Sequence, residues 1–231
     1  MWSENALVAF FSVYSEYMDR WLPALASASG TALTITIGSF AVACVLGLVV
    51  AGLRLSHSKL LSRLAVIYIE LFRSIPTLVL LFMLYYGIAP LGIVFDPIPA
   101  AILALGMAGS AHMAEILRAG VQAIPKGQRE AALTVGLTPL QSFRLIVFPQ
   151  ALRISLPPSI NMLIVLLKDS SLASLISAPE IMQSAKQIMS RDYMPLHILL
   201  VAGLIYLVLG LLLSLLANLV ERRFAANRSG R

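Results

Sequence analysis

Long apolar stretches separated by short polar segments dominate this chain. Five of the stretches are long enough to cross the hydrocarbon core of a bilayer, which is about 30 Å thick and requires about 20 helical residues. They cover residues 25–53, 64–90, 98–118, 155–178 and 197–220. The pattern therefore predicts an all-α polytopic membrane protein with five transmembrane helices, in which residues 25–220 form one transmembrane domain.

Residues 1–24 have a different pattern, with apolar side chains at helical spacing and polar side chains on the opposite face. The apolar positions are Leu7, Phe10, Phe11, Tyr14, Tyr17, Met18 and Trp21. This spacing predicts an amphipathic N-terminal helix. Such a helix can lie in the membrane interface or pack on another part of the protein, and both arrangements fit the pattern.

Charge is scarce and unevenly placed. Only 12% of the residues are charged, against about 25% in a typical soluble domain. The net charge of +6 could indicate nucleic-acid binding, but most basic residues lie in short segments next to spans, and such segments stay cytoplasmic. We therefore expect an external N-terminus, a large cytoplasmic loop at 119–154, a basic cytoplasmic tail at 221–231, and no nucleic-acid partner. The segments contain Arg54, Lys59 and Arg63; Arg118, Lys126, Arg129, Arg144 and Arg153; and Arg222, Arg223, Arg228 and Arg231.

The large loop contains signals for two short helices. The run that begins at Glu130 favours a helix ending at Gly136, because glycine accepts the left-handed conformation after a helix C-terminus. Thr138 is suited to the N-cap of the next helix, with Pro139 at its first position and Gln141 at its third. Two helices joined at a glycine predict a compact knob and a docking partner, although a plain amphipathic surface loop also fits.

The same loop resembles the EAA loop of ABC importer permeases. Glu130-Ala131-Ala132 is followed after three residues by Gly136, and after nine more by Ile146-Val147-Phe148-Pro149. The family has leucine where this chain has Phe148. The resemblance implies a type I importer permease fold. It also implies that Glu130, Ala131, Ala132 and Gly136 couple the chain to a cytoplasmic ATPase.

Further motifs narrow the resemblance to the permeases for polar amino acids. These motifs are Gly30–Thr34, Tyr68–Pro76, Ile124–Gln128, Phe148–Arg153 and Lys168–Leu172. Ser110-Ala111-His112 departs from the family, which usually has Gly-Ala-Tyr there. The resemblance implies import of a polar amino acid, or a derivative such as an opine or compatible solute, across the bacterial inner membrane. The implied partners are an ABC ATPase dimer, an identical or homologous second permease, an extracytoplasmic substrate-binding protein and the surrounding lipid.

Charged residues inside spans are costly and indicate either function or a buried pair. Lys168 and Asp169 lie about ten residues beyond Pro158, which is roughly 15 Å of helix and places them near the bilayer midplane. Ser170 and Ser171 add hydroxyl groups at this depth. These four residues are candidates for the substrate pathway, and a structural ion pair at a subunit contact is the alternative.

Three further charged sites lie in the predicted spans. Glu115 is one turn before Arg118, which favours a local pair, although Glu115 is also a pathway candidate. His112 either faces the pathway or packs against a neighbouring helix. Glu70 and Arg73 are one turn apart just before Pro76, and we expect them to form a structural pair.

The sequence argues against an enzyme. It lacks the GxxxxGK[ST] pattern of a phosphate-binding loop, so ATP and Mg²⁺ are expected on a partner chain, with no cofactor here. One cysteine, three histidines and no HExxH motif give no sign of a metal or an intramembrane protease. The remaining alternatives are an importer of another small organic solute and a proton-coupled transporter, whose usual internal repeat we do not find.

Overall fold

The computed structural model describes residues 4–226, and the elements in this range are helical. The α-helices are α1 (Glu4–Arg54), α2 (Lys59–Ser74), α3 (Thr77–Phe82), α4 (Pro97–Gln122), α5 (Lys126–Thr134), α6 (Pro139–Ser142), α7 (Phe148–Asp169), α8 (Ile181–Asp192) and α9 (Pro195–Ala226). Two π-helical turns cover Met83–Gly87 and Phe143–Val147, and two 3-10 segments cover Ala89–Leu91 and Ser170–Ile176. Residues 227–231 of the expected basic tail lie outside the described residues.

Four segments are long and apolar enough to cross a membrane: Val8–Arg54, Pro97–Gln122, Pro139–Ile176 and Pro195–Leu219. A fifth requires α2 and the segment Thr77–Leu91 to be counted together, although they are bent by 99°. The span expected over 64–90 is therefore interrupted by a sharp bend and is not a straight helix. Pro76 lacks a backbone N–H and forces Ile75 into an extended conformation (φ −82°, ψ 127°), which ends α2.

Helix α1 runs without a break across the boundary expected at residue 24, with Pro23 inside it. Trp21 and Leu25 are fully buried in a cluster formed with α8 and α9, and Tyr14 and Tyr17 pack against this cluster. The first part of α1 therefore packs on the protein itself, which is one of the two arrangements that the sequence pattern allows.

Helix α4 is the centre of the bundle and packs against α1 and α7. Ala100, Ala104 and Ala108 are buried, and small residues at this four-residue spacing allow a close approach between helices. The approach to α1 is so close at Gly106 that an added Cβ would lie 2.6 Å from the Val42 side chain. Small residues on α4 thus position the helices that carry the candidate site.

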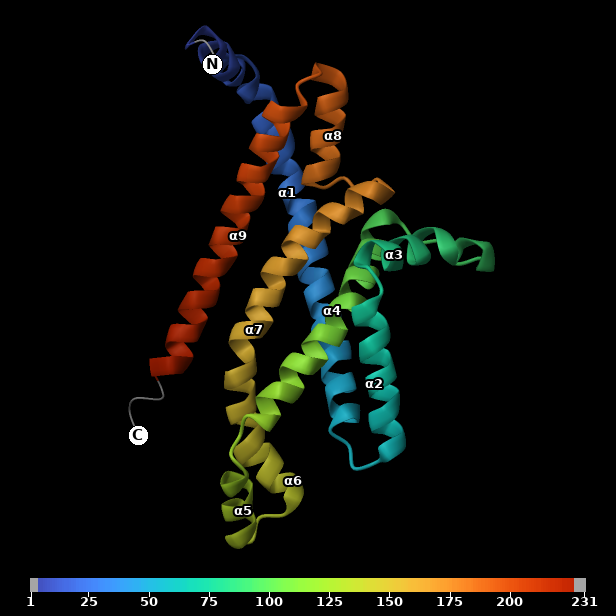
Figure 1. Cartoon of the computed structure of the whole chain (residues 1–231), viewed down its shortest axis with the longest axis vertical. Coiled ribbons are helices and arrows are strands. Elements are labelled where there is room, and N and C mark those ends of the chain that lie inside the picture. The colour runs from blue at the N-terminus through green and yellow to red at the C-terminus, as the bar shows by residue number, and fades with distance from the viewer. Residues whose placement is uncertain (1–3, 227–231) are drawn as a thin grey trace.

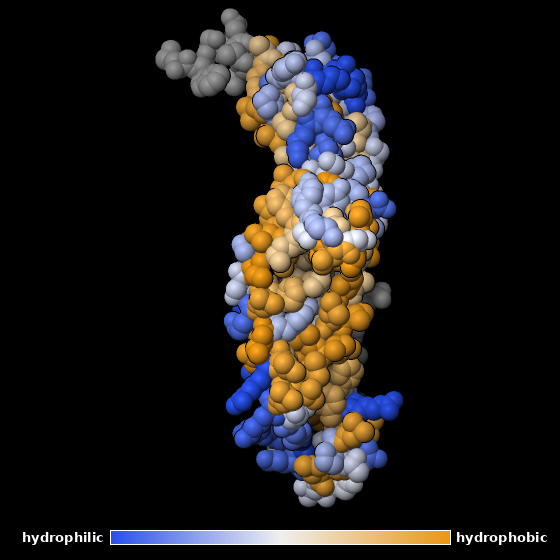
Figure 2. All heavy atoms as spheres, turned by 90° about the vertical axis from the view of Figure 1, so that its right-hand side faces the viewer, coloured by the Kyte–Doolittle hydropathy of each residue, from blue (hydrophilic) through white to orange (hydrophobic). Residues whose placement is uncertain are grey.

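The two ends of the molecule are distinct. Figure 1 shows α5 and α6 at one end, near the turn between α1 and α2, and the N-terminus and α8 at the opposite end. Figure 2 shows a broad apolar band between two hydrophilic ends on the face that it presents. Exposed leucines along α9, including Leu204, Leu211 and Leu215, provide apolar surface of the kind that contacts lipid.

Helix α8 lies in a segment, 179–196, that the sequence pattern left as a connecting loop. Its N-cap is Glu180, whose carboxylate is fully buried and accepts hydrogen bonds from the backbone N–H groups of Met182 (2.9 Å) and Gln183 (2.8 Å). The hydroxyl of Tyr206 on α9 donates a third hydrogen bond of 2.5 Å. At the other end of α8, Asp192 accepts hydrogen bonds from Trp21 (2.7 Å) and Arg20 (3.1 Å) of α1. These polar contacts fix α8 to α9 and α1.

Candidate functional site

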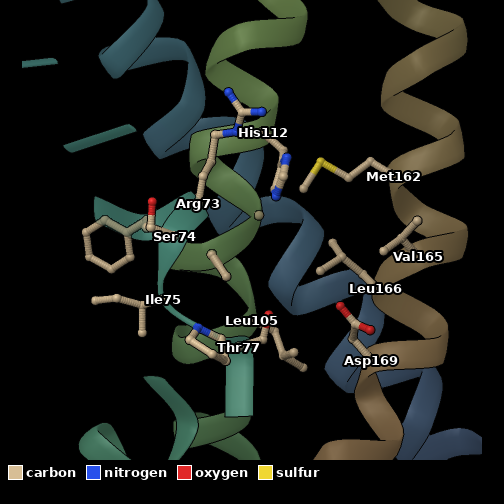
Figure 3. Close-up of a pocket in the computed structure, with 14 residues that line it drawn as sticks. Arg73, Ser74, Ile75, Thr77, Leu105, His112, Met162, Val165, Leu166 and Asp169 are labelled. Atoms are coloured by element: carbon tan, nitrogen blue, oxygen red, sulfur yellow. The ribbon is translucent and has the colours of Figure 1, made fainter. Parts of the chain in front are cut away.

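A cavity of about 250 Å³ lies where the break between α2 and α3 faces α4 and α7. The extended residues Ile75 and Pro76 form one wall, and Leu105 and Gly109 of α4 form another. Helix α7 contributes Met162, Val165, Leu166 and Asp169 (Figure 3). The cavity is slightly smaller than the ~300–1,000 Å³ typical of sites for drug-sized ligands, so its size suits a small solute.

Three ionisable side chains line this cavity, one from each of three helices. They are Arg73 at the end of α2, His112 on α4 and Asp169 at the end of α7. In Figure 3 Arg73 and His112 lie toward one end of the cavity and Asp169 toward the other. Within residues 8–219, whose side chains the structure describes, none of the three makes a side-chain hydrogen bond or an ion pair. A positive and a negative group are therefore available to a ligand.

A second cavity, of about 560 Å³, continues from the first toward α5. It is lined by Arg73, His112, Glu115, Arg118 and Ile154, among others. Arg118 donates to the carboxylate of Glu115, with Nη2 2.6 Å from Oε2. The local pair expected from the sequence is therefore formed, and it lies on the wall of this second cavity.

The structure separates the other pathway candidates from the cavity. Lys168 is exposed and absent from the cavity lining. Ser170 donates its hydroxyl to the carbonyl of Leu167 (2.7 Å), and Ser171 donates to that of Lys168 (2.7 Å). A helix rotates by about 100° per residue, so Lys168 points away from the side on which Asp169 lines the cavity.

The expected pair of Glu70 and Arg73 is not formed among the described residues, whose ion pairs involve Arg20, Arg118 and Arg191. Glu70 is exposed on α2 and does not line the cavity. Arg73 instead faces His112. Sequence reasoning therefore missed Arg73 as a cavity residue, and the available signal was its position three residues before the helix-breaking Pro76.

The knob formed by α5 and α6 has the backbone geometry that its residues predict. Gly136 has φ +86°, and its N–H donates to Leu133 while that of Leu137 donates to Ala132, which is a Schellman motif. Thr138 and Gln141 form the reciprocal capping box. Helix α6 is not separate, however: it continues through the π-helical turn Phe143–Val147 into α7, so this helical segment begins well before residue 155.

The knob exposes the residues expected to contact an ATPase. Glu130 and Ala131 are exposed, while Ala132 is buried. Val135 and Leu140 are also exposed, at 77% and 75% of their surface. Large apolar side chains this exposed at the hydrophilic end of the molecule provide a surface for protein contact.

Comparisons with known proteins agree with this architecture. Residues 43–226 match the family described as binding-protein-dependent transport system inner membrane component. A probable amino-acid ABC transporter permease, YckA of Bacillus subtilis, is 39% identical over 198 residues, covering 85% of this chain and 87% of the relative. The nopaline transport system permease NocM of Agrobacterium fabrum is 39% identical over 209 residues, covering 86% and 87%.

A solved structure of an amino acid ABC transporter with histidines has a chain similar to this one. It superposes with a TM-score of 0.85 at 34% identity and covers 89% of this chain and 96% of its own length. The MetNI methionine ABC transporter, at 23% identity and a TM-score of 0.70, shares the fold.

Proposed function

We propose that this chain, which belongs to the family of inner membrane components of binding-protein-dependent transport systems, moves a polar amino acid through the cavity between Arg73 and Asp169. The chain is the permease subunit of an ABC importer, a multi-pass inner-membrane protein, and ATP hydrolysis belongs to a separate subunit. The proposal concerns the solute and the residues that bind it. The relatives named for amino acids and an opine support this class of solute.

The observation that carries the proposal is the pair of unpaired opposite charges in one small cavity. A carboxylate held away from water without a partner is costly, and Asp169 has no such partner among the described residues. A zwitterionic amino acid supplies both missing partners, because its ammonium group suits Asp169 and its carboxylate suits Arg73, whose guanidinium can donate two parallel hydrogen bonds.

The assignment of Asp169 to the solute site can be tested by comparing its substitution with that of the adjacent residue, Lys168. The complete transporter, in proteoliposomes with its ATPase and binding protein, should lose apparent affinity for its amino acid at least about tenfold in Asp169→Asn. A hydrogen bond to a charged group contributes about 1.5–3 kcal/mol, and tenfold corresponds to about 1.4 kcal/mol. Lys168→Gln is the matched control and should keep the wild-type affinity. Equal affinities in the two variants would show that Asp169 does not bind the solute.

We also propose that the knob docks on the cytoplasmic ATPase through Glu130, Ala131 and the apolar side chains of Val135 and Leu140. Permeases of this family function with an ATPase and a substrate-binding protein. Glu130→Lys and Leu140→Asp should both reduce co-purification of the ATPase, since both residues are exposed and neither change should disturb folding. Gln128→Lys, on helix α5 together with Glu130, is the control. Undiminished co-purification in both variants would exclude this docking surface.

The orientation that we propose places the N-terminus outside and the knob in the cytoplasm, with a second permease subunit beside the chain. The N-terminus and the knob lie at opposite ends of the molecule (Figure 1), which supports this arrangement. Labelling with a membrane-impermeant thiol reagent tests this orientation. The two variants are Val8→Cys and Leu140→Cys, each combined with Cys44→Ser, and both positions are exposed. In intact cells or spheroplasts only the first should react, and the reverse pattern would invert the topology.

A further inference from the structure

The two cavities follow one another along the same pair of helices. On α4 the lining advances from Leu105 and Gly109 in the first cavity, which we call the outer cavity, to Ala119 and Ala123 in the second, which we call the inner cavity. On α7 it runs from Asp169 and Met162 in the outer cavity to Pro158 and Ile154 in the inner one. Because α4 and α7 pack against each other and both extend from the region of α3 toward the end that carries α5 and α6 (Figure 1), the cavities are consecutive compartments of one path.

Two residues belong to the described lining of both compartments: Arg73 and His112. They come from different helices, α2 and α4, and their side chains lie at the end of the outer cavity that is remote from Asp169 (Figure 3). Both are exposed rather than packed. Neither side chain makes a hydrogen bond or ion pair among the described residues, so each can change rotamer without breaking one, and this boundary is able to open.

The position of Arg73 gives the boundary a way to respond to helix movement. Arg73 lies in the last turn of α2, and the chain becomes extended at Ile75 before α3 begins at Thr77. Movement of α2 against α4 would therefore change the separation of Arg73 and His112 without deforming a helix.

We propose that Arg73 and His112 form an inner gate that separates the substrate cavity from an inner vestibule containing the Glu115–Arg118 pair. The inference rests on the proposed function, because it treats the outer cavity as the solute-binding site. A solute that leaves this cavity passes between the guanidinium and the imidazole. The positive charge of Arg73 attracts the carboxylate of an amino acid and opposes inorganic cations, so the gate restricts leakage of ions through the path.

Passive leakage in the absence of ATP tests the gate. The complete transporter is reconstituted in liposomes loaded with radiolabelled glycine, a small zwitterion whose passage does not require that glycine be the transported amino acid. His112→Ala removes one half of the gate and should raise ATP-independent efflux at least about tenfold, which corresponds to a barrier lower by ~1.4 kcal/mol. His112→Tyr restores a large ring at this position and should return efflux close to wild type.

Lys168→Ala is the matched control. Lys168 is exposed on α7 and lines neither cavity, so its truncation leaves the boundary unchanged, and efflux should stay at the wild-type level. Equal efflux from His112→Ala and Lys168→Ala would overturn the gate. His112 is exposed, so the alanine variant should fold, and His112→Gln provides a second truncation if it does not.

The two proposals fail in different ways. If the wild-type transporter accumulates no amino acid with ATP, the proposed solute is wrong, while glycine efflux from His112→Ala still decides whether the gate exists. If uptake occurs and efflux does not depend on the size of residue 112, the solute assignment stands and the gate is refuted.

Discussion

Gly120 of α4 faces α7 at a distance that leaves no room for a side chain. A Cβ added there would lie 2.0 Å from the hydroxyl oxygen of Ser155 and 2.9 Å from the backbone carbonyl oxygen of Ala151. Rotation of Ser155 could relieve the first contact, although it would lose the 3.3 Å hydrogen bond that its hydroxyl donates to Ile116. The second contact involves backbone, so Gly120→Ala requires the two helices to separate.

The expected cost can be worked from two opposing effects. Overpacking a close contact costs about 1–3 kcal/mol, whereas replacing glycine by alanine inside a helix contributes about 1 kcal/mol of stability. Gly203 on α9 has no atom within 4 Å of an added Cβ, so Gly203→Ala should show the favourable effect alone. Gly120→Ala should therefore be less stable than Gly203→Ala by about 1–3 kcal/mol.

Reversible unfolding in mixed micelles of a mild detergent and SDS measures this difference in free energy. The double variant Gly120→Ala with Ser155→Ala should recover part of the loss, because the nearest atom is removed while the carbonyl of Ala151 remains. If Gly120→Ala is as stable as Gly203→Ala, then α4 and α7 do not approach each other as closely as the structure shows. The cavities between these helices would then also differ in shape.

Three further predictions concern the ends of the molecule. Gly136→Ala should lower stability by about 1–2 kcal/mol, the cost of a left-handed alanine, whereas Gly127→Ala in α5, with open space at its Cβ, should not; SDS titration compares them. Tyr206→Phe should cost about 1–3 kcal/mol because Glu180 loses a donor inside the protein, and a melting temperature equal to that of wild type would contradict this. Asp192→Ala should cost a similar amount by leaving the buried indole N–H of Trp21 without an acceptor. Hydrogen bonds from Arg191 and Trp21 hold the pKa of Asp192 below its usual 3.8, so its stabilising contribution is present above that pH and is lost as the pH falls through the lowered pKa; unfolding midpoints across this range, compared with those of Asp192→Ala, measure that loss.

The knob was the part of the fold most fully predictable from sequence, because its signals are local. The left-handed conformation of Gly136 and the capping box of Thr138 and Gln141 depend on residues within a few positions of each other. The resemblance to the permease family covers the same residues. Local backbone chemistry is thus sufficient to locate both helices, although it does not show that α6 is continuous with α7.

The parts that were not predictable depend on contacts distant in sequence. Hydropathy alone joins α2 to the following apolar segment, and Pro76 indicates an interruption without indicating the 99° angle between the two parts. Helix α8 has too few apolar residues to resemble a span, and it is held by Tyr206 and Trp21 from other helices. Likewise, depth estimated from sequence does not distinguish Lys168 from Asp169, because only the rotation of α7 decides which of them lines the cavity.

The continuity of α6 with α7 bears on how movement could reach the cavity. Pro149 has no backbone N–H to donate to Leu145, and the chain accommodates this with a π-helical turn in which the N–H of Phe148 donates to Phe143. The knob is therefore joined to the wall that carries Met162 and Asp169 by one helical path rather than by a flexible loop. If the knob docks on the ATPase as we propose, its displacement would shift α7 against α4 at Gly120, where an added Cβ would lie 2.0 Å from Ser155.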